Sequence, residues 1–201
     1  MRLRRSICST LFILCAVTSA RAQKHDTKYD TNFPTDDEIR LVLTQAERAI
    51  REYKPLLDMQ EKTFGKAGAE AVKKDRETVH GIDVAIVAFG KNPQAFNGPM
   101  GFAFFEWLDD ACRNALLSSE SAMNSATEGL MGGDKQKAQT NIELAKDLVN
   151  VSTVLYTVSE NAGALYARYV AGEDKLAQVG LKAATDCLDI LKKGTKTTAK
   201  P

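Results

Sequence analysis

Two residues near the middle of the chain have the spacing of an iron-binding motif. Glu77 and His80 form a Glu-x-x-His pair, which in ferritin-like carboxylate bundles points inward and binds iron. If Val72 and Val79 mark the buried side of this helix, Glu77 lies roughly 160° away from it at about 100° per residue. This placement favours a surface glutamate beside a boundary histidine over a metal site.

Haem ligation is a second cofactor hypothesis. His80 paired with Met59 or Met123 has the ligand types of a b-type haem. Met123 belongs to an apolar stripe, however, where methionine ordinarily fills the core. The chain has no C-x-x-C-H motif, which excludes covalent c-type haem. We therefore expect no cofactor, and a metal- or haem-binding bundle remains the alternative.

The start of the mature chain offers a separate nitrogen site. If cleavage follows Ala22, the chain begins Gln23-Lys24-His25. A free amine, two deprotonated amides and the His25 imidazole then form a square-planar set that suits Cu(II) or Ni(II). The alternative is coincidence, because any residue can fall third and an N-terminal glutamine can cyclise.

Signatures of catalysis are missing from the sequence. It contains no G-x-S-x-G, no G-x-x-x-x-G-K-[ST], no H-E-x-x-H and no C-x-x-C. Carboxylates are plentiful, but on amphipathic helices they usually form the solvated face. An extracytoplasmic enzyme is therefore the least favoured of three function classes, after a binding or structural module and a cofactor-binding bundle.

An aromatic cluster in and after a Gly/Pro-rich stretch is the candidate interaction surface. It comprises Phe96, Met100, Phe102 and Trp107. Trp107 lies about 110° off the apolar centre of its helix, and an off-face tryptophan can anchor a protein partner or a small apolar ligand. The interpretation that we favour is that the stretch folds over one end of the protein and these side chains plug it.

Two cysteines of the mature chain, Cys112 and Cys187, are predicted to form a disulfide. If the chain reverses at Gly132-Gly133 and again at Gly172, the two cysteines lie about 6 Å apart along the bundle axis. That offset is compatible with disulfide geometry. The alternative is a pair of buried thiols.

The N-terminus reads as a secretory signal peptide, residues 1–22. Three arginines precede an apolar run of about 11 residues, too short to cross a bilayer, and Ala20-Arg21-Ala22 is a typical cleavage signal. We therefore expect a secreted or periplasmic protein. If the host is eukaryotic, Asn150 lies in an N-glycosylation sequon.

Removing residues 1–22 takes the net charge from +1 to −3, because four arginines leave and no acid does. A weakly acidic chain is not expected to bind nucleic acid. No later segment is long and apolar enough to predict an integral membrane helix.

Helical periodicity extends over most of the mature chain. Apolar residues recur at helical spacing in 35–64, 69–89, 102–130, 135–171 and 173–193. Thr35 and Glu38 form a capping box, Pro55 predicts a kink rather than a stop, Gly90 suits a helix C-terminus, and Asp134 suits an N-cap.

The helix at 135–171 stands out because its apolar residues point in two directions. Ile142, Val149 and Tyr156 lie in one direction with Ala138 and Ala145, and a second set lies in another. A face this wide requires neighbours on two sides.

These patterns predict an all-α protein, an up-and-down bundle of four to five antiparallel helices. The expected organisation is a signal peptide at 1–22, a flexible arm at 23–34, the bundle domain at 35–194 and a disordered Lys/Thr tail at 195–201.

Overall fold

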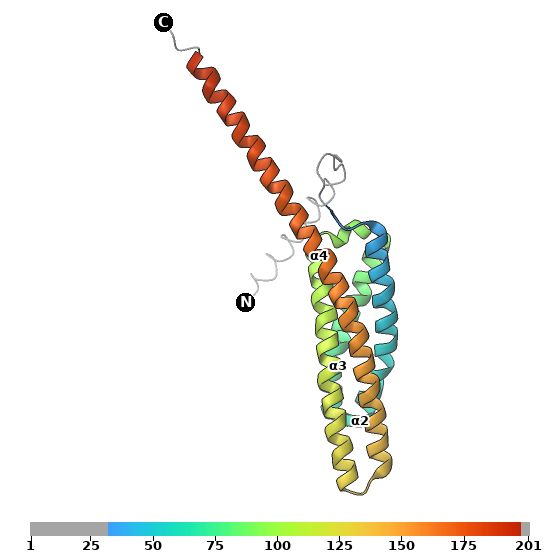
Figure 1. Ribbon diagram of the computed structural model, residues 1–201. Coiled ribbons are helices and arrows are strands. Elements are labelled where there is room, and N and C mark those ends of the chain that lie inside the picture. Colours follow the sequence, from blue (N-terminus) through green and yellow to red (C-terminus); the bar gives the residue numbers. More distant parts are fainter. Residues whose placement is uncertain (1–31, 198–201) are drawn as a thin grey trace, which may run out of the picture. The chain divides into compact units, whose positions relative to one another are not determined.

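The computed structural model describes residues 32–197, with the side chains of 67, 71, 180, 183–184 and 186–197 left aside. Within this range the elements are α2 (Asp36–Lys91), η1 (Pro93–Phe96), α3 (Pro99–Met131) and α4 (Lys135–Thr197), as Figure 1 shows. The described range contains no strand, so the all-α prediction is confirmed. The predicted signal peptide and the end of the predicted tail lie outside it.

The chain divides into two compact units. Residues 34–166 form one, and the second contains the described residues 32–33 and 167–197. The predicted domain at 35–194 includes residues of both units. None of the helices in the described part of the chain has both the length and the apolar character that crossing a bilayer requires.

Helix α2 is two antiparallel arms rather than one rod. Its only non-helical backbone is at Gly65 (φ 58°, ψ −133°), a conformation that glycine adopts readily. The arms, residues 36–64 and 66–91, lie side by side, since Lys54 Nζ is 2.7 Å from an Asp83 carboxylate oxygen. With α3 and the first part of α4 they make an antiparallel four-helix bundle (Figure 1), within the predicted four to five helices.

The predicted caps and turns are largely confirmed. The Thr35 backbone N–H donates to the Glu38 carboxylate at 2.8 Å, and the Glu38 N–H donates to the Thr35 hydroxyl at 3.3 Å. Asp134 accepts a hydrogen bond from the backbone N–H of Lys137 at 2.9 Å. Pro55 lies inside α2 without ending it. Gly90 does not end α2, however, which continues to Lys91.

Aromatic side chains close one end of the bundle core. Phe89, Phe96 and Phe104 pack edge to face, with ring centroids 5.5–6.4 Å apart. They come from α2, η1 and α3. The Gly/Pro-rich stretch therefore contains a 3-10 turn, and α3 begins at Pro99, before the predicted helix at 102–130.

The prediction of a break at Gly172 and a fifth helix after it is wrong. Helix α4 runs through Gly172 without interruption. The glycine serves a contact instead: a methyl group there would lie 2.6 Å from the ring of Phe33. Arg168 donates to the carbonyl oxygens of Asn32 and Phe33, both at 3.2 Å. The end of the predicted flexible arm is thus held against α4, because it carries an aromatic ring that packs there.

Candidate functional site

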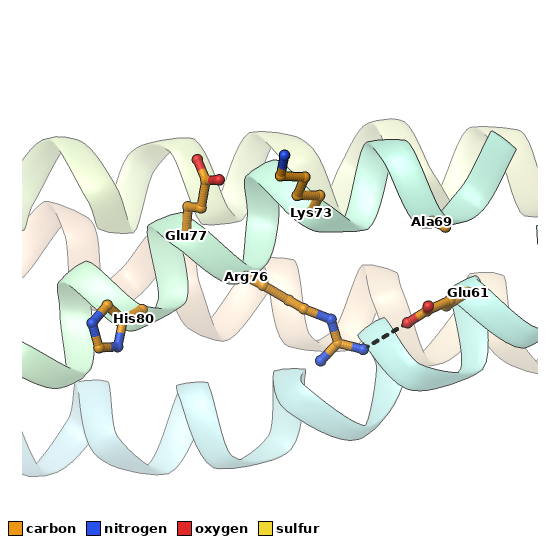
Figure 2. A pocket seen from close by; sticks show the side chains of 6 residues that line it. All are labelled: Glu61, Ala69, Lys73, Arg76, Glu77 and His80. Carbon is orange, nitrogen blue, oxygen red and sulfur yellow. Dashed lines mark hydrogen bonds and ion pairs between the residues drawn. The ribbon is translucent and has the colours of Figure 1, made fainter. Parts of the chain in front are cut away.

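The proposed metal ligands of α2 lie on the surface. Glu77 and His80 are both exposed on its second arm. They line a shallow groove of about 510 Å³ with Glu61, Lys73 and Arg76, and Figure 2 shows the Glu77 and His80 side chains pointing in different directions. Among the residues described, no three His, Cys, Asp or Glu side chains are placed to hold a metal ion.

One charge of this groove, Arg76, is paired with carboxylates across the two arms. Arg76 donates to Asp58 at 2.7 Å and to Glu61 at 2.9 Å, and Figure 2 draws the second contact. Lys54 and Asp83 pair further along the same seam. These paired groups therefore hold the two arms together at the surface.

The remaining cofactor candidates are scattered. Met59 and Met123 are both at least one-third exposed on the surface. The prediction that Met123 belongs to the buried stripe of α3 is therefore wrong, and Leu130, the last residue of the apolar range 102–130, is also exposed. His25 lies outside the described residues. Asn150 is exposed on α4.

A buried carboxyl group is the most unusual chemical feature of the core. Asp75 is only 4% exposed. Its two carboxylate oxygens accept hydrogen bonds from the Tyr53 hydroxyl at 3.3 Å and from the Asn114 amide at 2.7 Å. These three residues come from the two arms of α2 and from α3, so the network joins three of the four helices.

Burial shifts the titration of this network. Desolvation raises the pKa of Asp75 above its ordinary value, and the hydrogen bonds from Tyr53 and Asn114 act in the opposite direction. Burial and the nearby Asp75 charge raise the pKa of Tyr53 as well. Since Tyr53 is fully buried, no substrate reaches this pair. The network is a structural and pH-sensitive element rather than an active site.

The burial of Asp75 was not predicted, although the sequence contains a pattern that indicates it. Asp75 lies three residues after Val72 and four before Val79, both of which are buried. These spacings place it on the buried face of the helix. A carboxylate in that register is expected to be buried and hydrogen-bonded.

The four residues of the predicted aromatic surface differ in how far they are exposed, and they do not form one surface. Phe96 is fully buried and belongs to the core, so it cannot line a surface. Met100 is half-buried against the core. Trp107 is also half-buried, and a methyl group on Gly81 would lie 3.0 Å from its ring. Phe102 alone is exposed, with its ring centroid 5.6 Å from that of Tyr166.

Contacts between α3 and α4 fix which residues of the two helices lie level. The Cys112 thiol donates to the Ser152 carbonyl oxygen at 3.4 Å. Gly163 packs closely on the Phe105 ring, and Gly129 on the backbone of Ala138. By this antiparallel register, Leu116 lies level with Val149, and Met123 with Ile142.

Two rows of exposed apolar side chains follow this seam at intervals of seven residues, except that Asp109 interrupts the α3 row. On α3, Phe102 comes three positions before Phe105, Leu116 four after Cys112 and Leu130 one after Gly129, all of which contact α4. On α4, Ile142 comes four positions after Ala138 and Tyr156 four after Ser152, and Val149 lies midway between them. Residues three or four apart are neighbours on a helix surface, so both rows flank one seam. We call them the α3–α4 strip, whose members are 37–59% exposed: Phe102, Leu116, Met123, Leu130, Ile142, Val149 and Tyr156.

The predicted Cys112–Cys187 disulfide stays untested. The Cys187 side chain lies outside the described residues. The register argument for the pairing no longer holds, however, because it required the chain to reverse at Gly172. Burial raises the pKa of the Cys112 thiol.

No known family, no curated protein and no solved structure matches this chain. The function is therefore argued from the geometry of these regions.

Proposed function

We propose that this chain is an exported helical-bundle protein that binds another protein through the α3–α4 strip. The observation that carries the proposal is the strip itself, seven large apolar side chains gathered along one seam and substantially exposed. Scattered apolar side chains are normal on a surface, whereas a continuous patch of them indicates a binding site. The strip is long and its rows keep a seven-residue period, which suits a helical protein surface better than a small ligand.

The composition of α4 supports the same conclusion. Its two apolar directions require neighbours on two sides. Ala138 and Ala145 are covered within the bundle, but Ile142, Val149 and Tyr156 are exposed. A protein partner on the strip would supply the missing neighbour.

Export is supported by the sequence alone. Residues 1–22 have the basic start, the short apolar run and the small-residue cleavage signal of a secretory peptide. The proposal places the bundle outside the cytoplasm.

Photo-crosslinking in the native host tests both parts. With p-benzoylphenylalanine at position 149, we expect a protein adduct after irradiation of the exported fraction, and intact mass should give a chain beginning at Gln23. Position 157, exposed on the adjacent polar side of α4, is the matched control and should give none. Equal adduct at both positions would overturn the binding proposal. A product that retains residues 1–22 would overturn the export proposal.

A further inference from the structure

We propose that the partner of the α3–α4 strip is the same strip of a second copy, in an antiparallel two-fold dimer centred between Leu116 and Val149. This inference rests on the proposed function, because it names the partner for that surface. Three features of the strip support this dimer: the size of the strip, its internal symmetry and the charges beside it.

The strip has the size that a homodimer needs. Its seven side chains leave on the order of 600 Å² of apolar surface exposed, the upper end of what single patches on monomers reach. A stable interface of standard size buries about 800 Å² on each partner, including a polar rim. The strip and the polar residues beside it therefore meet this requirement without another element.

The rows are symmetric about their centre. On α3, Phe102 and Leu130 lie fourteen positions either side of Leu116, and on α4, Ile142 and Tyr156 lie seven either side of Val149. Leu116 and Val149 are level across the seam. A two-fold axis through that level, perpendicular to the helices, brings each residue opposite its counterpart in the other copy.

This operation pairs apolar groups with apolar groups at every position of the strip except Met123. Phe102 faces Leu130 of the second copy, Ile142 faces its Tyr156, and Leu116 and Val149 face their own equivalents. Such a self-complementary patch is what a two-fold interface requires. Asp109 takes the remaining position opposite Met123, and its carboxylate is already paired with Arg113 on its own helix.

The charges beside the strip are complementary under the same operation. Arg113 lies three residues before Leu116 and Glu120 four after it, so both are its neighbours on α3, and both are exposed. The two-fold axis places Arg113 of each copy within one residue, about 1.5 Å along the helix, of the position opposite Glu120 of the other. On α4 it places Lys146 opposite Thr153, so no like charges meet there. An ion pair of this kind contributes to register and specificity more than to affinity.

Sedimentation equilibrium of the purified exported protein between 1 and about 200 µM tests the dimer. We expect a mass of two copies that falls to one on dilution. Val149→Glu places two carboxylates at the centre of the interface and should weaken dimerisation on the order of 100-fold. Far-ultraviolet circular dichroism and the thermal midpoint establish that each variant is folded.

Exchanging the charges of Arg113 and Glu120 tests how the two copies are aligned. This test also applies if Val149→Glu does not fold. Arg113→Glu alone and Glu120→Arg alone should each weaken the dimer, and the double variant should restore it. Lys62→Glu, an exposed charge reversal on α2, is the matched control and should change nothing. A failure of the double variant to restore the dimer overturns the antiparallel arrangement.

A protein that stays monomeric at every concentration, or a dimer that Val149→Glu leaves intact, overturns the self-association. These outcomes are separable from the proposed function. A monomer whose position 149 crosslinks to a different protein keeps the strip as a binding surface and replaces only its partner.

Discussion

The bundle has two seams that differ in chemistry. Charged side chains that pair with one another line the outer seam between the two arms of α2. The apolar side chains of the α3–α4 strip line the seam between α3 and α4. Lys54 and Arg76 of α2 have carboxylate partners within the same hairpin. Apolar side chains at a surface gain free energy only when something covers them. The paired charges of the α2 seam therefore already have their partners within one chain, whereas the apolar side chains of the α3–α4 strip would gain free energy when a partner covers them.

The turns of the two hairpins differ as well, and the largest expected effect concerns them. Gly65 and Gly133 both have positive φ, but the ψ of −133° at Gly65 lies in a region that essentially only glycine occupies. We predict that Gly65→Ala costs about 1–3 kcal/mol of unfolding free energy. Urea denaturation of the purified protein measures it.

Gly133→Ala is the matched control in the other hairpin. A methyl group at either position meets nothing within 4 Å, so the comparison isolates backbone strain. We expect a smaller loss at position 133, about 1 kcal/mol. Equal losses would show that the α2 turn is no more constrained than the α3–α4 turn.

An intermediate effect is expected from the buried carboxyl that lies beneath the charged seam. Because the pKa of Asp75 is raised in the folded protein, the native state holds its proton more tightly than the unfolded chain. The contribution of this group to stability therefore falls as pH rises from its unfolded pKa of about 3.9 through the folded value, and then levels off. Asp75→Asn removes this loss and should stabilise the protein by about 1 kcal/mol at pH 7.

Unfolding free energies of both proteins between pH 3.5 and pH 8 check the sign, and their difference should widen with pH. Tyr53→Phe should act in the opposite direction, because it removes a hydrogen bond that lowers the pKa of Asp75. A difference between Asp75→Asn and the parent that stays constant with pH would contradict the assignment.

The smallest effect is expected from the ion pairs that make the α2 seam self-sufficient. Lys54 and Asp83 are both about half exposed, and exposed pairs contribute about 0.2–1 kcal/mol. A double-mutant cycle with Lys54→Gln and Asp83→Asn should give a coupling energy in that range, decreasing as salt is added. A coupling energy above about 2 kcal/mol would mean that the interaction between Lys54 and Asp83 is far stronger than an exposed ion pair provides.

The fold was accessible from the sequence because its helices are long and their boundaries are chemically marked. The capping box at Thr35 and the Gly132-Gly133 turn are local signals, and both predicted boundaries are confirmed. Gly172 was misread because a glycine within a helix has two explanations, a break or a close approach by another group. Only the position of Phe33 distinguishes them.

The candidate sites were harder to predict, because periodicity gives a direction on a helix but not which neighbours cover it. Met123 and Leu130 lie on the broad apolar side of α3, yet the structure leaves them exposed beside the seam with α4. For Phe96 the Gly/Pro-rich stretch left a surface and a plug both open, and the 3-10 turn directs it into the core. Both outcomes depend on tertiary packing that no local pattern contains.

The contact between Phe33 and Gly172 also constrains how this protein can vary in evolution. The ring occupies the space that any side chain at position 172 would need. Related sequences that carry a larger residue at 172 should therefore carry a smaller one at 33, and the two positions should co-vary although they are far apart in the chain.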